Sequence, residues 1–299
     1  MISLRKDRLD WLAVSILLVC CMTWGAQQVL TKATLAEVPP VFQACLRFAG
    51  STVFLWLWCQ WRGIKLFERD GSLKWGIISA LLFSSEFAAM NLGLQHTTAS
   101  RLTLFVYTSP FVVALVLPLF VPAEKLRKLH WLGFAIAFIG VGLALSEGLS
   151  VSQNGVSSLR GDLLGLYAGM MWGLTTVVIR TTGLTLISPE KLLFYQVAIS
   201  TFTLGAFSAW RGESWAVAHY SSFAWGSVLI QGLVISFLSY LAWMWMLGRY
   251  PATKISVFVF LTPVFALLFG SLFLQESISS ILLLALACVA VGIVIVNRK

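Results

Sequence analysis

One carboxylate lies well inside an apolar stretch of the sequence. Glu86 stands in the segment SSEFAAMN, within an apolar run at 74–95. If this run crosses a membrane, a charge at its centre costs about 3 kcal/mol, so the carboxyl must be paired, protonated or in contact with water. Removal from water favours the protonated form, which makes Glu86 a candidate coupling residue that carries a proton or contacts a substrate. The alternative is a structural ion pair with Arg47 or Arg101.

Polar residues on one face of two further apolar runs are candidates to line a cavity. Trp24, Gln27 and Gln28 lie three or four residues apart, and Trp172 and Thr176 repeat the spacing of four. Residues at this spacing share one face of a helix. Such a face would hydrogen-bond a substrate, or it would join helices to one another.

Other candidates are singled out by their chemistry. Arg101 opens an apolar run and would anchor a carboxylate or phosphate, or alternatively extend to lipid headgroups. Aromatic and amide side chains would offer surface to an apolar ligand or a cation, with packing as the alternative for each: Asn91, Tyr107, Tyr240, Trp243 and Phe258. Scattered histidines and cysteines show no metal-ligand spacing, so no metal site and no cofactor is expected.

The elements that position these residues are predicted to be membrane helices. Of the 299 residues, 59% are hydrophobic and 11% are charged, and the mean hydropathy is +0.87, whereas soluble domains are about 25% charged. A span in lipid must satisfy its own backbone hydrogen bonds, which favours helices. We expect an all-α integral membrane protein with ten transmembrane helices, at about 11–31, 41–61, 74–95, 99–121, 130–147, 162–181, 191–210, 224–247, 253–274 and 278–296.

The net charge of +9 is explained by topology. With the N-terminus in the cytoplasm, most loop lysines and arginines fall on the cytoplasmic side, as the positive-inside rule requires. We therefore expect a multi-pass protein of the cell membrane with both termini cytoplasmic. No basic stripe or nucleic-acid motif is present, so no nucleic-acid partner is expected.

The chain contains an internal repeat. MTWGAQQVLTK at 22–32 resembles MMWGLTTVVIR at 170–180, and RLTLFVYTSPFVVAL at 101–115 resembles KISVFVFLTPVFALL at 254–268. This predicts a five-helix repeat over 12–147, a connecting loop over 148–161 and a second repeat over 162–296. Because five is odd, the halves would enter the membrane in opposite directions around a central cavity, as in many secondary transporters. Pro110 and Pro263 occupy matching positions, where each would kink its helix or be merely tolerated.

These motifs together resemble the drug/metabolite transporter superfamily, specifically tandem EamA domains. The resemblance rests on the WG at Trp24, the Arg47–Phe48 pair, the Ser/Thr-Pro motifs, and the acidic residues Glu124 and Glu276. It implies a ten-helix basket with a central cavity, located in a bacterial inner membrane. Members of this family export amino acids, other metabolites or drugs, and some import. Arg47 has no basic counterpart in the second half, so any role of that residue is confined to the first half.

The function predicted is a secondary transporter of small organic solutes. The leading interpretation is an amino-acid or metabolite exporter that works by alternating access, with proton coupling as an open option. The alternatives are drug or cation efflux and a flippase for lipid-like substrates; an intramembrane enzyme is disfavoured because no GxSxG or HExxH motif is present. The expected partners are a small-molecule substrate and the lipid bilayer, and the sequence leaves open whether the protein is a monomer or a dimer.

Overall fold

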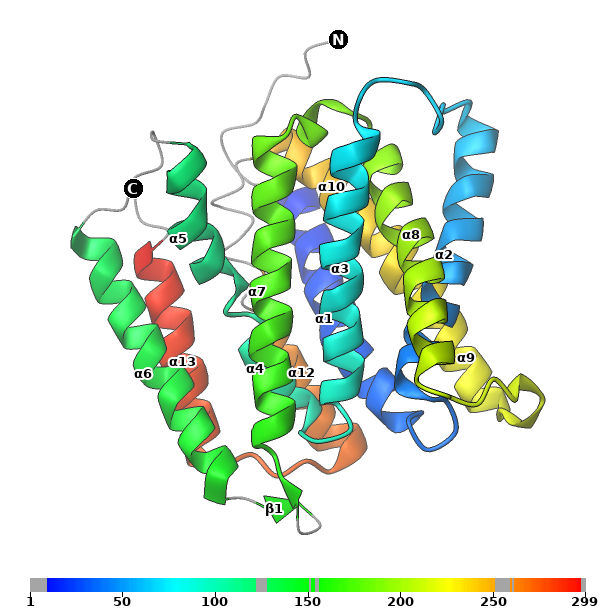
Figure 1. The fold of residues 1–299 in the computed structure, drawn as a ribbon. Helices are drawn as coiled ribbons and strands as arrows, with labels where there is room; N and C mark the ends of the chain where they lie inside the picture. The colour runs from blue at the N-terminus through cyan, green and yellow to red at the C-terminus, as the bar shows by residue number, and fades with distance from the viewer. Residues whose placement is uncertain are drawn as a thin grey trace.

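The described residues form a bundle of helices with a short hairpin at one end (Figure 1). A computed structural model describes residues 10–121, 128–150, 152–153, 156–250, 259 and 261–296. The first half contains α1 (Trp11–Ala33), α2 (Pro40–Arg62), α3 (Leu73–Gly93), α4 (Ala99–Val106), α5 (Ser109–Phe120) and α6 (Lys128–Ser150). Next come the antiparallel strands β1 (Ser152–Gln153) and β2 (Val156–Ser157).

The rest of the chain is also helical. It contains α7 (Leu159–Thr181), the short helix η2 (Leu184–Leu186), α8 (Pro189–Trp210), the short helix η3 (Val217–His219), α9 (Ser222–Ile230), the π-helical segment η4 (Gln231–Ser239), α10 (Tyr240–Arg249), α12 (Leu261–Leu274) and α13 (Ser280–Val296). The expected connecting loop at 148–161 therefore holds the last turn of α6, the hairpin and the start of α7. We call the end of the bundle with β1 and β2 the hairpin end, and the other the α2–α3 loop end.

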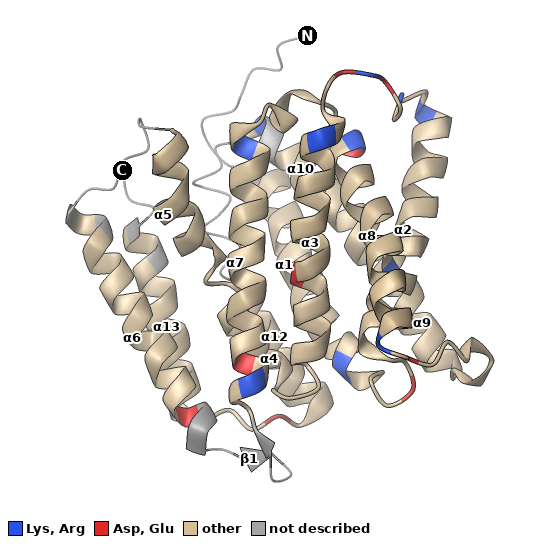
Figure 2. Cartoon of the chain, viewed as in Figure 1, with Lys and Arg blue, Asp and Glu red and all other residues tan. Residues whose placement is uncertain are grey.

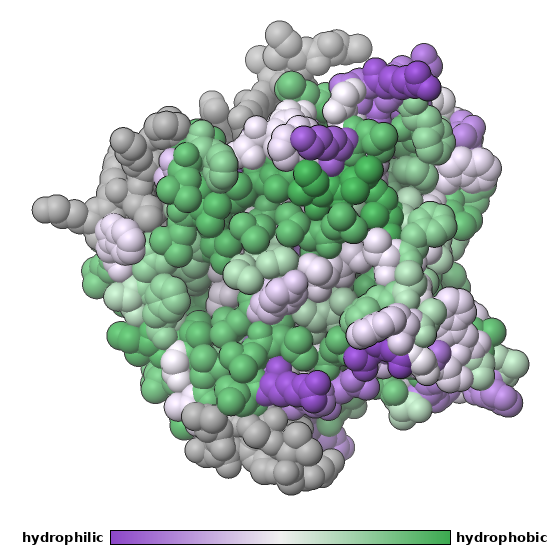
Figure 3. Space-filling view, viewed as in Figure 1, coloured by the Kyte–Doolittle hydropathy of each residue, from purple (hydrophilic) through white to green (hydrophobic). Residues whose placement is uncertain are grey.

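Helix length and surface character fit a membrane. Within the described ranges, 7 helices are long and apolar enough to cross a bilayer, counting α4–α5 and α9–η4–α10 as one each, and shorter apolar helices lie at Trp131–Glu147, Leu261–Leu274 and Ser280–Gly292. A broad hydrophobic band covers the face in Figure 3, with hydrophilic residues above and below it, and most charged residues gather at the two ends (Figure 2). A helical membrane protein is thus confirmed, while the exact number of ten spans stays a prediction.

Sequence features explain where several helices start and stop. Asp10 caps α1 by accepting a hydrogen bond from the Ala13 N–H at 2.9 Å, and Ser188 caps α8, whose first residue is Pro189. Both residue types are favoured at these positions because the first N–H groups of a helix have no partner inside it. Gly63 ends α2 with a φ of 67°, a left-handed conformation that glycine adopts without strain.

The span from Ala99 to Phe120 is broken in its middle. α4 ends at Val106 and α5 begins at Ser109, with Pro110 in the first turn of α5. Proline has no N–H to donate to the preceding turn, so the break lies where the sequence predicts a kink. A Cβ on Gly169 of α7 would lie 2.8 Å from the Val106 carbonyl oxygen, so only glycine lets α7 approach the break so closely. Pro263 lies in the first turn of α12, and residues 251–258 and 260 before it are outside the described part.

The core lies where helices of the first half of the chain pack against helices of the second half. α3 packs against α7 and α8, α2 packs against α8 and η4, and α1 packs against α12 and η4. α6 and α13 form a separate pair at one side of the bundle (Figure 1). A Cβ on Gly140 would lie 2.8 Å from the Ala285 carbonyl oxygen, so small residues bring this pair together, as is common between membrane helices.

Candidate functional site

Two opposite charges are buried in the interior between α2 and α3. Glu86 of α3 is 4% exposed and Arg47 of α2 is 1% exposed. The Oε2 of Glu86 and the Nε and Nη2 of Arg47 have no hydrogen-bond partner among the described residues. The two groups interact electrostatically, yet no Arg47 nitrogen lies within the 4.0 Å of a Glu86 oxygen that defines an ion pair. The ion pair that the sequence offers as an alternative is therefore not formed.

Aromatic rings hold the Arg47 guanidinium in place. Its Cζ lies 4.5 Å from the ring centroid of Phe48 and 4.4 Å from that of Phe87. Phe83 contacts Phe87 at 4.7 Å and reaches Tyr240 of α10 at 6.3 Å between centroids. These contacts connect the charged pair to the second half of the chain. They follow from the helical spacing of four that puts Phe83 and Phe87 on one face of α3.

An aromatic group from α1 and α10 lies next to this interior. Trp24 meets Tyr240 at 6.0 Å and Trp243 at 5.3 Å, both edge to face. The Trp24 indole N–H donates to the Ser239 hydroxyl at 2.8 Å, and the Tyr240 hydroxyl donates to the Gln27 side-chain oxygen at 3.5 Å. The structure thus brings together four residues that the sequence predicts to line a cavity.

The break between α4 and α5 adds a third group. Tyr107, within the break, meets Trp172 of α7 edge to face at 5.2 Å. Tyr107 also interacts electrostatically with Glu86 and Tyr240, so it borders the same interior. Its position depends on the close approach of α7 that Gly169 permits.

The remaining predicted residues are placed differently. Gln28 is buried on α1. The Asn91 amide donates to the Phe87 carbonyl at 2.9 Å, and the Thr176 hydroxyl donates to the Trp172 carbonyl at 3.1 Å. These local bonds occupy donors that a substrate would need. Phe258 lies outside the described residues.

Arg101 is not near Glu86 but in a buried ion cluster at the hairpin end. Its guanidinium lies 2.6 Å from Glu147 of α6 and 2.6 Å from Asp162 of α7, and it also donates to the Ala144 carbonyl. An ion pair with Glu86 and an extension to lipid headgroups are both contradicted by this placement. The reason is that α6 and α7 both meet the start of α4, and the position of Arg101 in the sequence does not reveal this.

A second carboxylate at the hairpin end holds the start of α4. Glu276, which follows α12, accepts hydrogen bonds from the Ala99 N–H at 2.7 Å, from the Ser100 N–H at 3.2 Å and from the Ser100 hydroxyl at 2.7 Å. The Lys32 ammonium lies 3.8 Å away and donates to the Thr97 carbonyl. The sequence marks Glu276 only as part of a motif. Its role here is to satisfy the free N–H groups of a helix from the other half of the chain.

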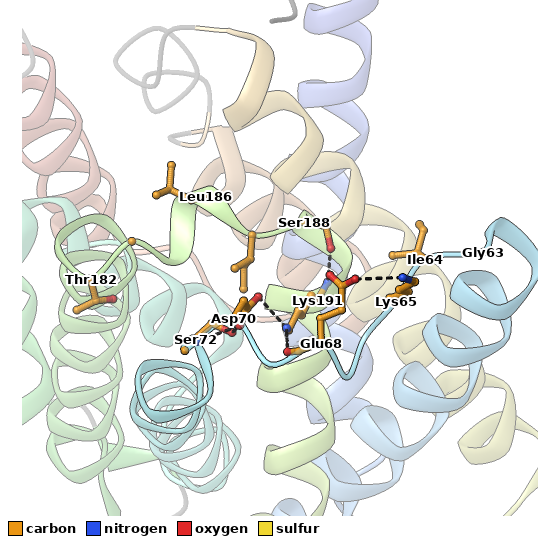
Figure 4. Close-up of a pocket in the computed structure, with 13 residues that line it drawn as sticks. Gly63, Ile64, Lys65, Glu68, Asp70, Ser72, Thr182, Leu186, Ser188 and Lys191 are labelled. Carbon is orange, nitrogen blue, oxygen red and sulfur yellow. Dashed lines mark hydrogen bonds and ion pairs between the residues drawn. The ribbon is translucent and has the colours of Figure 1, made fainter. Parts of the chain in front are cut away.

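A pocket of about 650 Å³ opens at the α2–α3 loop end (Figure 4). It lies between the loop after α2 and the segment that joins α7 to α8. The Lys191 ammonium donates there to the Asp70 carboxylate at 2.8 Å and to the Glu68 carbonyl at 2.7 Å. The Lys191 and Ser72 hydrogen bonds hold the pKa of Asp70 well below its usual range. No sequence prediction pointed to this pocket.

Comparisons with known proteins identify the family. Residues 11–146 and 159–298 both match the EamA-like transporter family. The chain is 26% identical to the uncharacterized transporter YoaV of Bacillus subtilis, covering 91% of this chain and 92% of the relative. It is 28% identical to an uncharacterized transporter of Archaeoglobus fulgidus, covering 87% and 89%, and 27% identical to a chloroplastic WAT1-related protein of Arabidopsis thaliana, covering 97% and 69%.

A solved crystal structure of a protein has the same fold. Its TM-score is 0.66 at 18% identity, and the match covers 95% of this chain and 96% of that chain. At this identity the likeness extends to the fold alone. The family match, by contrast, covers both halves of the sequence, and the relatives are named as transporters and not as enzymes. The chain therefore belongs to the EamA-like transporter family and is a membrane transporter.

Proposed function

We propose that this transporter exports small organic solutes by alternating access, with amino acids and related metabolites as its substrates. The observation that carries the proposal is the buried pair of Glu86 and Arg47, opposite charges with unpartnered atoms in a membrane-spanning bundle. Ionisable residues inside a membrane protein are costly and mark substrate or proton pathways. Tyr240 interacts electrostatically with both residues of the pair. Trp24 meets Tyr240 and Trp243, and these rings would enclose the rest of the solute.

The packing of the helices supports an inverted repeat of ten spans divided at 12–147 and 162–296. In that scheme α1 corresponds to α7, and the α4–α5 span corresponds to the span that ends with α12. α1 packs against α12 and α7 packs against α4 and α5, while α2 packs against η4 and α8 packs against α3. Each contact thus recurs with the halves exchanged, which is what a two-fold relation between the repeats requires.

Polar contacts between the halves at both ends suit alternating access. At the hairpin end, Glu276 holds the start of α4, and Glu213 accepts from the Phe42 N–H at the start of α2 at 2.8 Å. At the α2–α3 loop end, Asp70 holds Lys191. Because each bond joins one half to the other, rocking of the halves would break one set while the other persists. We infer from the charge bias along the sequence that the protein lies in an inner membrane with both termini in the cytoplasm. In this orientation the α2–α3 loop end, where α1 begins and α2 ends, faces the cytoplasm.

Glu86 is the residue we assign to proton coupling. A carboxylate out of contact with any cation is stabilised either by taking up a proton or by binding a cationic group of the solute. The two events exclude each other at one carboxylate, so arrival of the solute would release the proton and its departure would allow protonation again. This exchange needs no cofactor and no metal, and the described residues contain no cluster of three or more metal-ligating side chains.

Transport into inside-out vesicles tests the proposal. Vesicles with the protein are given radiolabelled amino acids of the aromatic, branched and hydroxylated classes, with and without an imposed pH gradient. We expect saturable accumulation that falls when the gradient collapses and in Glu86→Gln, but not in the control Glu68→Gln, whose side chain is exposed. Accumulation that survives Glu86→Gln would make the residue structural, and no accumulation of any amino acid would remove this substrate class.

Efflux of organic cations is the second candidate function. The edge-to-face group of Trp24, Tyr240 and Trp243 next to an acidic residue would also suit a flat cation, because aromatic faces attract positive charge. Ethidium efflux from energised cells distinguishes the two. Protein-dependent efflux of ethidium without amino-acid accumulation would favour this function.

A further inference from the structure

The unpartnered atoms of Arg47 are the two on one edge of its guanidinium. Nε and Nη2 both lack a hydrogen-bond partner among the described residues. The N–H bonds on these two nitrogens are parallel and point in the same direction, which is the geometry for bidentate hydrogen bonding to both oxygens of one carboxylate. The rings of Phe48 and Phe87 lie 4.5 Å and 4.4 Å from Cζ. Cation–π contacts of this kind act on the cation from the ring face and leave that N–H edge unused.

The missing partner of Arg47 is not Glu86. Both residues belong to the described part of the chain and interact electrostatically, but they do not form an ion pair or a hydrogen bond. Glu86 keeps its own Oε2 without a donor. Buried charges are normally paired, because an unpaired one loses its water shell without compensation. A ligand with an anionic and a cationic group would supply a partner to each residue, and Glu86 would release the proton it holds in the absence of solute as the cationic group of the ligand arrives.

We propose that Arg47 and Glu86 form a two-point site for a zwitterionic α-amino acid. The carboxylate of the ligand accepts the parallel N–H groups of Arg47, and its ammonium group donates to Glu86. This inference rests on the proposed transport function and adds to it the two contacts that select the substrate class. Both contacts contribute, because a ligand with one charge makes only one of them and leaves the atoms of the other residue buried without a hydrogen-bond partner.

The surroundings of the pair indicate the side chain of the ligand. Phe83 connects the rings beside Arg47 to Tyr240, and Tyr240 meets Trp24. These are large apolar surfaces, with the Trp24 N–H already bound to Ser239. An apolar or aromatic side chain would pack there without losing hydrogen bonds. We therefore expect phenylalanine and leucine to bind better than aspartate or lysine.

Binding to purified protein in nanodiscs at pH 7 tests the site. Radiolabelled L-phenylalanine is the probe, and the competitors are unlabelled phenylalanine, its methyl ester, which keeps only the ammonium, and 3-phenylpropionate, which keeps only the carboxylate. Wild-type protein should prefer the zwitterion over each analogue by about 10-fold or more, the usual weight of a hydrogen bond to a charged group. This panel needs no variant, so a failure of a variant to fold does not affect it.

Two variants then assign each contact. With labelled probes, Arg47→Gln should lose the preference for phenylalanine over its methyl ester, and Glu86→Gln should lose the preference over 3-phenylpropionate. The control Arg62→Gln, which removes an arginine at the end of α2 over Trp58, should keep both preferences. A structural pair would instead give equal losses for all three ligands.

The results separate this inference from the transport function. Equal affinity of wild-type protein for the zwitterion and both analogues, or no binding of phenylalanine, would overturn the two-point site even if vesicles accumulate other solutes. The absence of any accumulation in vesicles would instead overturn the transport proposal. The two-point site would be supported if Arg47→Gln lost only the preference over the methyl ester and Glu86→Gln lost only the preference over 3-phenylpropionate.

Discussion

Removal of the charge of Glu276 should loosen the start of α4 by about two orders of magnitude. Glu276→Gln keeps the shape of the side chain but replaces one acceptor oxygen by an amide group that faces an N–H donor. The wild-type carboxylate accepts three hydrogen bonds, from the Ala99 N–H and from the N–H and hydroxyl of Ser100. Hydrogen bonds to a charged group contribute about 1.5–3 kcal/mol and neutral ones about 0.5–1.5 kcal/mol. A loss of about 1 kcal/mol at each bond sums to about 3 kcal/mol, or about 100-fold in the opening equilibrium.

Hydrogen exchange measures this opening directly. The first N–H groups of a helix have no acceptor inside it, so the protection of the Ala99 and Ser100 amides depends on Glu276. Hydrogen-exchange mass spectrometry on peptides that cover 97–104 should show about 100-fold faster exchange of these two amides in Glu276→Gln. Unchanged exchange would refute the reasoning, since it would mean that Glu276 does not hold α4.

A matched variant controls for general loosening of the protein. Glu37 accepts hydrogen bonds from the N–H and hydroxyl of Ser221, just before α9, at 2.7 Å and 2.9 Å. Glu37→Gln removes the same type of contact from another helix start. It should speed exchange near Ser221 and leave residues 97–104 unchanged. Faster exchange at 97–104 in this control would show that the effect in Glu276→Gln is not local.

Three further predictions concern stability in detergent. Arg101→Met leaves the buried carboxylates of Glu147 and Asp162 without their cation and should lower the free energy of unfolding by about 3–5 kcal/mol, which is measured as a lower Tm. The control Lys65→Ala removes an exposed ion pair and should cost less than about 1 kcal/mol. Gly169→Ala puts a methyl group 2.8–2.9 Å from atoms at the α4–α5 break and should lower the Tm, at a cost of about 1–3 kcal/mol in unfolding free energy. The same change at Gly142, where nothing lies within 4 Å, should be neutral or stabilising. Equal Tm values for the two variants would contradict this prediction. The hydrogen bonds from Lys191 and Ser72 lower the pKa of Asp70. The stability that they contribute is therefore complete above the ordinary aspartate pKa of about 3.9 and is lost as the pH falls below that value. Asp70→Asn should reduce the loss of Tm at acid pH, and a pH profile of Tm identical to that of the wild type would contradict this prediction.

Several sequence predictions depended on local pattern and agree with the structure. The apolar runs became helices because lipid leaves no other way to satisfy the backbone. The duplicated motifs indicated the family that both halves match. The spacing of Trp24 and Gln27 placed both on the face that meets Tyr240. Such patterns repeat every few residues, and they are visible without knowledge of which helices are neighbours.

Predictions that required a partner from far along the chain were less successful. Arg101 was interpreted as a substrate anchor or a headgroup contact, but Asp162 of α7 and Glu147 of α6 bind it. The same limit hid the contact of Lys191 with Asp70 and the pocket beside it. Each of these contacts joins segments far apart in the sequence, so no spacing within one helix could reveal it.

The sequence by itself determined that this is a helical membrane transporter with a buried acid at Glu86, because hydrophobicity and motif order are properties of the linear chain. Only the tertiary structure decided that Glu86 and Arg47 share one interior without forming an ion pair. That outcome depends on how α2 and α3 pack, with the Arg47 guanidinium against the rings of Phe48 and Phe87. Pairing of buried charges is a matter of distances of a few ångströms across helices, and helix packing alone sets those distances.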